Sequence, residues 1–288
     1  MIISLSGKKQ SGKDTVATLI NGIILSNLYN EGINGINYKD YANENYFKVK
    51  RFAGSLKKII SAILNISLED LESEKVKNSF LGEEWWYYGV DNTKYPYLDY
   101  KDFSEDQLKS QFGEYNLVKL TPRLFLQLLG TEGGRKVIHP DIWVNSTLSE
   151  YNSNKKWLIT DTRFPNEING IKRKAEKSIF INVVRLKTYK EWYEDLKSIM
   201  TISRIPNLFT NYTWETEKVR IEAFMERFER AECCVFTKEY YDFKNTFLHE
   251  SENALNSFKD WDYQIYNDGS IGDLIDKVRK ILITEKII

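Results

Sequence analysis

The hydrophobic pattern of the chain switches repeatedly between short apolar runs and helical spacing. Apolar runs typical of buried parallel strands occupy residues 2–5, 155–161 and 178–186, with shorter strand signals at 47–52 and 262–270. Apolar residues recur at helical spacing in 15–28, 55–64, 120–130, 139–151, 165–177 and 271–282. Ser55 is the predicted N-cap of its helix. Strands that alternate with helices predict a three-layer α/β protein, with a parallel sheet flanked by helices.

Two stretches interrupt this alternation. Residues 67–118 are acidic, aromatic and rich in turn formers, with little periodicity, and residues 187–248 contain two further helical stretches. The chain shows neither internal repeats nor low-complexity linkers. We therefore predict one domain over 1–288, with a substrate-side segment inserted at 67–118 and a helical, lid-like segment inserted at 187–248.

The segment "GKKQSGKDT" at residues 7–15 fits the phosphate-binding pattern G-x-x-x-x-G-K, and it lies between a predicted strand and a predicted helix. Backbone N–H groups of such a loop surround phosphate oxygens, and the following helix directs its positive end to the same place. The lysine adds a cation for the terminal phosphates. The predicted nucleotide-binding residues are Gly7, Ser11, Gly12, Lys13, Asp14 and Thr15. The alternative is a glycine-rich turn that only caps a helix.

The position after the lysine departs from the usual pattern, in which Ser or Thr supplies a hydroxyl to magnesium. Here Asp14 follows Lys13, and Thr15 comes next. Asp14 is predicted to hold magnesium through water, or Thr15 to take the hydroxyl role.

A phosphoryl-transfer enzyme must also neutralise the charge of its acceptor, and arginine suits this task because its fork binds two oxygens at once. Arg163 follows a predicted strand in "ITDTRFPNE", where open parallel sheets bind their ligands. Asp161 shares this edge and is a candidate for positioning magnesium or accepting from a substrate hydroxyl. Glu167, four residues after Arg163, is a candidate for orienting it. The alternative is a capped turn with a surface salt bridge.

Four more residues are candidate substrate contacts. Arg123 and Gln127 lie one helical turn apart and share a face, which suits binding of a phosphate and a base edge. Trp143 either stacks on a base or packs in the core. Arg135 either binds the substrate or is a surface cation.

The chain has 41 basic and 41 acidic residues, so its formal net charge is zero, which argues against a dedicated nucleic-acid binder. No apolar run approaches the ~20 residues of a membrane span, and the amino-terminal run is too short for a signal peptide. The two cysteines are adjacent, at Cys233 and Cys234, which fits a reducing compartment. We expect a cytoplasmic protein without a membrane partner or a stable nucleic-acid partner.

Several motifs occur in an order that resembles the deoxynucleoside monophosphate kinases of tailed bacteriophages. They are "LSGKKQSGKDT", "RFAGSLKKII", "RLFLQLLGT" with "DIWVN", "LITDTRFPNE", "VVRL", "HESENAL" and "YNDGSIGDLIDKV". The resemblance implies a P-loop kinase fold and transfer of the γ-phosphoryl group of ATP, with Mg²⁺, to a deoxynucleoside monophosphate in the cytoplasm of a phage host. Gln10 departs from the family, which often has arginine there. A homodimer is left open.

The resemblance also implies residue roles. ATP would contact Gly12, Lys13, Asp14 and Thr15, whereas the acceptor nucleotide would face Lys9, Arg123, Gln127, Trp143, Asp161, Arg163 and Glu167. Catalysis is then positioning and charge stabilisation by Lys13 and Arg163, with Asp161 beside them and one lid arginine drawn from Arg185, Arg204 and Arg220.

Three alternatives remain from the sequence. The first is another small-molecule P-loop kinase, acting on phosphomevalonate or dephospho-coenzyme A. The second is a nucleotide-binding ATPase or switch, and the third is a structural subunit that kept the fold without activity.

Overall fold

The computed structural model describes residues 1–8, 10–28, 46–90, 97–99, 104, 106–107, 110, 115–185 and 254–288. The chain divides into two compact units, the first formed by 1–59, 128–186 and 250–288 and the second by 60–127 and 187–249. Both predicted insertions fall within the second unit, but 187–248 lies outside the described residues. The boundaries of the insertions therefore stay a prediction.

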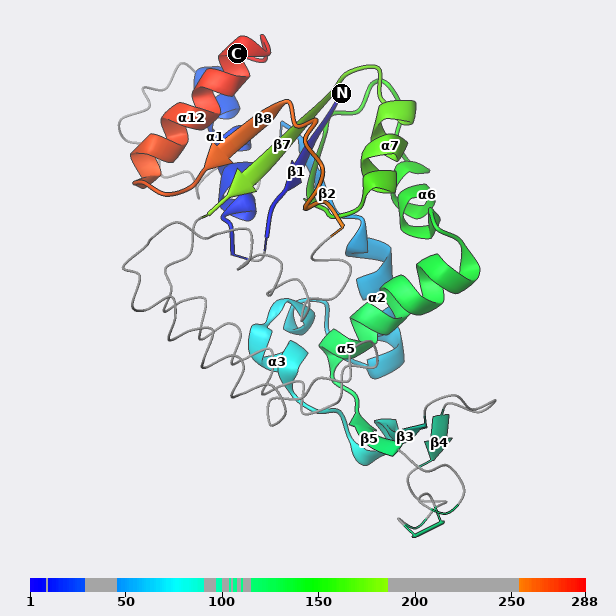
Figure 1. The fold of residues 1–288 in the computed structure, drawn as a ribbon. Coiled ribbons are helices and arrows are strands. Elements are labelled where there is room, and N and C mark those ends of the chain that lie inside the picture. Colours follow the sequence, from blue (N-terminus) through cyan, green and yellow to red (C-terminus); the bar gives the residue numbers. More distant parts are fainter. Residues whose placement is uncertain are drawn as a thin grey trace. The chain divides into compact units, whose positions relative to one another are not determined.

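The first unit is built on a five-stranded parallel sheet whose strands run in the order β2-β6-β1-β7-β8 (Figure 1). The strands are β1 (Ile2–Ser6), β2 (Lys48–Lys50), β6 (Trp157–Thr162), β7 (Ser178–Val184) and β8 (Tyr263–Tyr266). Because every neighbouring pair is parallel, the carboxyl ends of all five strands lie at one edge of the sheet. The predicted α/β fold with a parallel sheet is confirmed.

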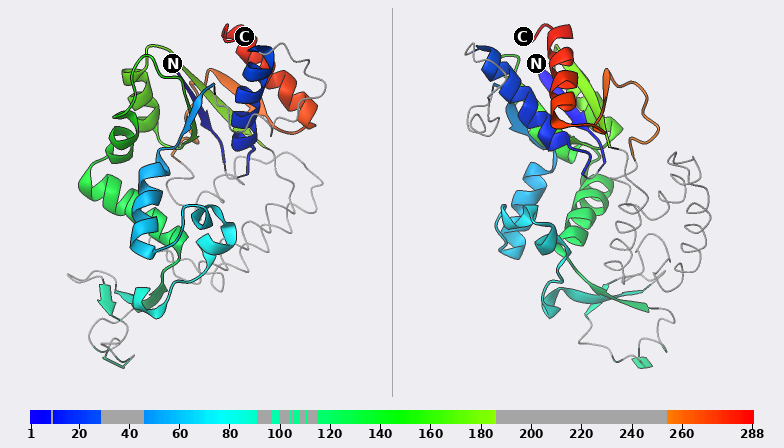
Figure 2. Two further views of the ribbon diagram at one scale, coloured as in Figure 1. Left: turned by 180° about the vertical axis from the view of Figure 1, so that it is seen from behind. Right: turned by 90° about the vertical axis from the view of Figure 1, so that its left-hand side faces the viewer.

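Helices cover both faces of this sheet (Figures 1 and 2). One face packs against α1 (Lys13–Leu28) and α12 (Ile271–Thr284), and the other against α6 (Ile142–Leu148) and α7 (Pro165–Lys174). The pleat of β1 divides its side chains between these layers, because successive side chains of a strand point to opposite faces. Ile3 and Leu5 belong to the α1 and α12 layer, whereas Ile2 belongs to the α6 and α7 layer.

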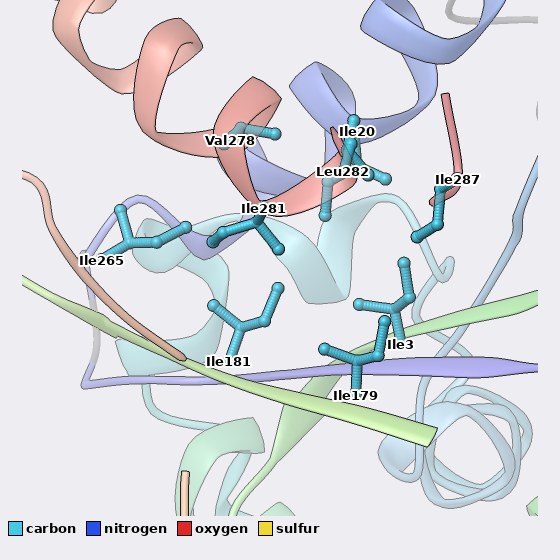
Figure 3. A pocket seen from close by; sticks show the side chains of 9 residues that line it. All are labelled: Ile3, Ile20, Ile179, Ile181, Ile265, Val278, Ile281, Leu282 and Ile287. Carbon is cyan, nitrogen blue, oxygen red and sulfur yellow. The ribbon is translucent and has the colours of Figure 1, made fainter. Parts of the chain in front are cut away.

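The apolar layer beneath α12 fixes the closing helix on the sheet. Ile3, Ile179 and Ile181 rise from the strands toward Ile281 and Leu282 of α12 (Figure 3). The space between these side chains has no room for a water molecule. Fully burying one such side chain stabilises a fold by about 1.5–3 kcal/mol, so this layer stabilises the packing of α12 on the sheet.

Two helical segments of the chain differ from their predicted bounds. The helix α2 (Ala53–Leu64) begins two residues before Ser55, so the prediction that Ser55 is its N-cap is wrong. Its first N–H groups instead reach the Asp161 carboxylate, which comes from β6. The helix predicted at 120–130 is replaced by α5 (Pro122–Gln127) and then η3 (Leu128–Ile138), an 11-residue π-helix.

The second unit contains a small antiparallel sheet, ordered β4-β3-β5, that the sequence did not predict. Its strands are β3 (Trp86–Val90), β4 (Tyr97–Asp99) and β5 (Tyr115–Lys119). The same unit holds η1 (Asp70–Glu72), α3 (Glu74–Asn78), η2 (Glu83–Trp85) and α5. Across the described ranges, no helix combines the length and the apolar character that crossing a membrane requires.

Candidate functional site

The glycine-lysine loop joins the end of β1 to the start of α1, as the sequence predicts. Gly7 and Gly12 have φ values of +151° and +93°, which favour glycine. A Cβ at Gly7 would also lie 2.4 Å from the carbonyl oxygen of Val183. The backbone of Gln10 adopts a left-handed conformation as well, with φ +61°. The turn is therefore closed by backbone geometry that most side chains would disrupt.

Hydrogen bonds hold the loop against the first turn of α1. The N–H of Ser11 donates to the carbonyl of Lys8 (3.1 Å), and the N–H of Val16 donates to the carbonyl of Gly12 (2.9 Å). The ammonium group of Lys13 reaches back to the same Lys8 carbonyl (3.3 Å). The hydroxyl of Ser11 is buried and has no hydrogen-bond partner among the described residues. A lysine ammonium group therefore lies against the loop at the amino terminus of α1.

The predicted metal ligands lie on the first turn of α1. Asp14 and Thr15 are both exposed there. The described residues contain no cluster of His, Cys, Asp or Glu side chains that would itself hold a metal ion. Magnesium at nucleotide sites usually takes one or two protein ligands together with phosphate oxygens and water, and the two exposed side chains fit that pattern. Lys9 lies outside the described residues.

Arg51, which was not among the predicted site residues, lies beside the loop. It follows β2, and its guanidinium contacts the Asp14 carboxylate at 3.4 Å. Its Nε also lies 3.4 Å from the hydroxyl of Thr160 on β6. The side chain is 41% exposed. Nothing in the local sequence around Arg51 indicates this contact, because it depends on the pairing of β2 with β6.

The ends of β1 and β6 bring the loop and the predicted acceptor residues to one edge of the sheet. Ser6 pairs with Thr162 in the parallel register, and the hydroxyls of Ser4 and Thr162 share a buried hydrogen bond of 2.6 Å. Gly7 and Arg163 each follow one of the paired residues. The two segments therefore leave adjacent strands side by side.

The carboxylate of Asp161 is engaged by the amino terminus of α2. One oxygen accepts from the N–H of Phe52 (2.8 Å) and the other from the N–H of Ala53 (2.9 Å). These bonds satisfy donors that have no partner within the helix. Asp161 is thus a helix cap in the structure, and its predicted part in catalysis stays a prediction.

Glu167 is the most deeply buried charged residue described at this edge, with 2% exposure. One carboxylate oxygen pairs with the guanidinium of Arg135 at 2.6 Å, and the other accepts from the N–H groups of Arg163 (2.6 Å) and Phe164 (3.0 Å). Arg135 also stacks over the Phe164 ring, 4.0 Å from its centroid. The carboxylate therefore fixes the backbone of Arg163 directly and ties η3 to the turn after β6.

Burial raises the pKa of Glu167 to about 7, with the neighbouring Asp161 charge acting in the same direction. Arg135 and the two backbone N–H groups oppose this shift, because they stabilise the ionised form. The capped turn of the sequence alternative agrees with the two N–H groups that Glu167 accepts, whereas the ion pair of Glu167 is with Arg135, whose side chain is only 11% exposed.

The remaining candidates lie in different surroundings. In the second unit, Arg123 on α5 pairs with Glu74 (2.7 Å) and donates to Asn78 (2.7 Å). Gln127 ends α5. Trp143 is only 4% exposed and donates its indole N–H to a backbone carbonyl at 2.7 Å, so the structure favours packing in the core over base stacking.

The proposed lid arginines are largely untested by the structure. Arg185 follows β7 and is exposed. Arg204 and Arg220 lie outside the described residues. The choice of a lid arginine therefore stays a prediction.

The fold and the loop agree with one class of protein: a parallel α/β sheet with a glycine-lysine loop after its central strand is consistent with the P-loop kinase fold. No protein-family model matches the chain. The chain is similar to the deoxynucleoside-5′-monophosphate kinase of Escherichia phage T5, with 28% identity over 213 residues. The match covers 64% of this chain and 78% of the phage protein. This comparison confirms the resemblance that the motifs indicate.

Proposed function

We propose that this protein is a deoxynucleoside monophosphate kinase that transfers the γ-phosphoryl group of ATP to a deoxynucleoside monophosphate, giving the diphosphate and ADP. One observation carries the proposal: the glycine-lysine loop and the Arg163 turn follow paired residues of adjacent parallel strands. Such an arrangement suits two charged ligands bound next to each other. The similarity to the phage T5 enzyme supports the reaction class.

The loop fits the phosphates of ATP. Its two glycines place no side chain at Gly7 and Gly12, and α1 directs its positive end to the loop. Lys13 supplies the mobile cation, and Asp14 and Thr15 would hold Mg²⁺ directly or through water. When bound, the metal ion would neutralise phosphate charge during transfer. Arg51 adds a second cation at the mouth of the loop by its contact with Asp14.

The turn after β6 fits the acceptor phosphate. Arg163 offers a planar fork of donors for phosphate oxygens, and Glu167 holds its backbone through a bond of 2.6 Å. Arg135 keeps Glu167 in place from the other side. The turn is therefore organised before the acceptor arrives, which reduces the ordering that binding would otherwise require.

The reaction asks for positioning and charge stabilisation more than for proton transfer. A phosphate monoester has its second pKa near 6, so the acceptor is already largely ionised at neutral pH. Lys13 and Arg163 would stabilise charge on the transferred group and the acceptor, and the sheet edge would hold both in line. We also propose that the inserted segments 67–118 and 187–248 cover the nucleotides and exclude water.

A turnover assay tests the proposed function. The purified chain is mixed with ATP, Mg²⁺ and each deoxynucleoside monophosphate in turn, and ADP is measured. We expect turnover of at least one deoxynucleotide in the host cytoplasmic pH range. Turnover of phosphomevalonate or dephospho-coenzyme A alone would replace the proposal with another P-loop kinase. Slow ATP hydrolysis that ignores every mononucleotide would replace it with an ATPase or switch.

A further inference from the structure

The segment "NDGS" at 267–270, between β8 and α12, has no part in the reaction described so far. Asn267 is its first residue. The backbone N–H of Asn267 donates to the carbonyl of Val184 at the end of β7 (2.7 Å), and its side-chain amide donates to the carbonyl of Ser11 (2.9 Å). A residue far along the chain thus joins the sheet to the middle of the phosphate loop.

We propose that Asn267 is a positioning residue that holds the phosphate loop in its nucleotide-binding conformation and so sets the affinity for ATP. The identity of the nucleotide rests on the proposed function. Asn267 would not contact the reacting atoms. It would act through the Ser11–Gly12 peptide unit, whose orientation it fixes.

The planarity of the peptide bond explains how this bond acts on the loop. In a trans peptide, the carbonyl oxygen and the N–H point in opposite directions. When Asn267 holds the oxygen of Ser11, the N–H of Gly12 must point away from Asn267. The oxygen of Gly12 is held in turn by the N–H of Val16. Both peptide units around Gly12 are thereby fixed, and their N–H groups are of the kind that such loops offer to phosphate.

Glycine at position 12 leaves room for the Asn267 amide, which a side chain there would displace. A Cβ there would lie 2.2 Å from the side-chain nitrogen of Asn267, a distance that real Cβ atoms do not adopt. The φ of +93° adds a backbone reason for glycine at the same place. The amide of Asn267 therefore packs directly on the Gly12 α-carbon, in addition to donating its hydrogen bond to the carbonyl of Ser11.

The anchor of Asn267 is itself rigid. Its backbone bond to Val184 continues the pairing of β7 with β8, and Leu274 and Val278 of the following helix are buried in the core. Substituting the side chain leaves this backbone bond intact. Variants at position 267 should therefore keep the end of β8 in place while releasing the loop.

Calorimetric binding of ATP–Mg²⁺ and, separately, of a deoxynucleoside monophosphate to the full chain tests the proposal. The variants are Asn267→Ala, which removes the amide, and Asn267→Asp, which keeps the shape but replaces the donor by a carboxylate. Gln264→Ala is the matched control, because it removes an exposed amide from β8, the strand that Asn267 follows.

We expect Asn267→Ala to weaken ATP binding roughly ten-fold, the upper range for one lost neutral hydrogen bond. Asn267→Asp should weaken it further, because a carboxylate cannot donate to Ser11 and repels phosphate. Binding of the deoxynucleotide, and both affinities of Gln264→Ala, should stay within about two-fold of the wild type. ATP affinities within about two-fold of the wild type in both Asn267 variants would overturn the proposal. Equal losses for ATP and the deoxynucleotide would overturn it too, since a general loss of structure affects both.

The binding assay also separates this proposal from the proposed function. A wild-type chain that binds ATP but phosphorylates no deoxynucleotide would contradict the function, and the ATP affinities would still decide the role of Asn267. If the chain phosphorylates deoxynucleotides and the Asn267 variants bind ATP as the wild type does, only the positioning role of Asn267 would be contradicted. A wild-type chain that does not bind ATP would contradict both.

Discussion

The two halves of the candidate site leave the same edge of the sheet but are held by different forces. The phosphate loop is shaped by glycine geometry and neutral hydrogen bonds, among them the bond from Asn267 to Ser11. The turn after β6 is held by a buried carboxylate, Glu167, that pairs with Arg135 and accepts two backbone N–H groups. Substitutions that add side-chain atoms should disturb the phosphate loop most. Loss of a charge or a change in pH should disturb the turn after β6 most.

The difference follows from the cost of burying a charge. A neutral hydrogen bond contributes about 0.5–1.5 kcal/mol net, because the unfolded chain bonds to water instead. Breaking a buried ion pair costs about 3–5 kcal/mol, because one charge is left without a partner. Losing one hydrogen bond should therefore destabilise the loop only slightly. Losing one partner of the ion pair should destabilise the whole turn after β6.

Glu167→Ala gives the largest effect that we expect on stability. The guanidinium of Arg135 cannot lose its proton, so it would remain charged at a site with 11% exposure. We expect a loss of about 3–5 kcal/mol in the free energy of unfolding, measured by urea denaturation at pH 7.5. Arg135→Met keeps the stem over Phe164 and lets Glu167 take up a proton, so it should cost clearly less. Equal losses in the two variants would contradict this asymmetry.

Lys13→Ala should give the largest effect on turnover while leaving stability nearly unchanged. Removing one preorganised donor that acts on developing charge lowers kcat by about 10²–10³-fold, and we expect a loss of that order here. The steady-state rate with the best deoxynucleotide measures this, and thermal unfolding checks the fold. Lys280→Ala, on an exposed position of α12, is the matched control and should retain wild-type activity. Full activity in Lys13→Ala would contradict the proposed role of the loop in the reaction.

The pH dependence of stability sharpens the contrast between the halves. The pKa of Glu167 is about 7 in the folded chain and 4.5 in its ordinary state, so the folded chain keeps this proton to higher pH than the unfolded chain. Between these two values the unfolded state binds fewer protons, and stability therefore falls as pH rises, by up to about 1.4 kcal/mol per pH unit from this group.

Urea denaturation of the wild type and of Glu167→Gln between pH 5 and 8 isolates that contribution. The variant lacks the titrating group, so the difference in unfolding free energy between the two proteins should change across the interval from about 4.5 to about 7. The unfolding free energy of the wild type should fall relative to that of Glu167→Gln as pH rises. A difference that is constant with pH would show that Glu167 does not titrate there.

Arg51→Ala should have the smallest effect on stability. Its ion pair with Asp14 is long, at 3.4 Å, and its side chain is 41% exposed. Exposed pairs of this kind contribute about 0–1 kcal/mol. We expect an unfolding free energy within that range of the wild type, together with weaker ATP binding, since the mouth of the loop loses a cation. A stability loss as large as that of Glu167→Ala would contradict this expectation, because it would show that Arg51 stabilises the fold as strongly as the buried Glu167 does.

Local sequence signals predicted the elements that depend on local physics. The strand before Gly7, the loop and α1 follow from an apolar run, glycine spacing and helical periodicity, and the same kinds of signal located β6, β7 and α12. What the sequence did not reveal depends on distant partners. The N-cap of α2 comes from Asp161, 108 residues away from Ala53, and not from Ser55.

Three further features were not predicted, and two of them also depend on partners that lie far away in the sequence. The hydrogen bond to the Ser11 carbonyl comes from Asn267, which lies 256 residues further along the chain. The small sheet of β3, β4 and β5 was missed because its aromatic and turn-forming segment lacks the clean alternation of a half-buried strand. Arg135 was named as a candidate substrate contact or a surface cation, and its pairing with a buried Glu167 could not be inferred from spacing.

The central claim is that the loop and the turn after β6 each bind the phosphate of a different nucleotide. Calorimetric titration of the wild type, Lys13→Ala and Arg163→Ala with ATP–Mg²⁺ and with a deoxynucleoside monophosphate tests it most directly. We predict that Lys13→Ala loses affinity for ATP and keeps its affinity for the deoxynucleotide, whereas Arg163→Ala does the reverse. Loss of the same ligand in both variants, or wild-type affinities for both ligands in Arg163→Ala, would contradict the claim.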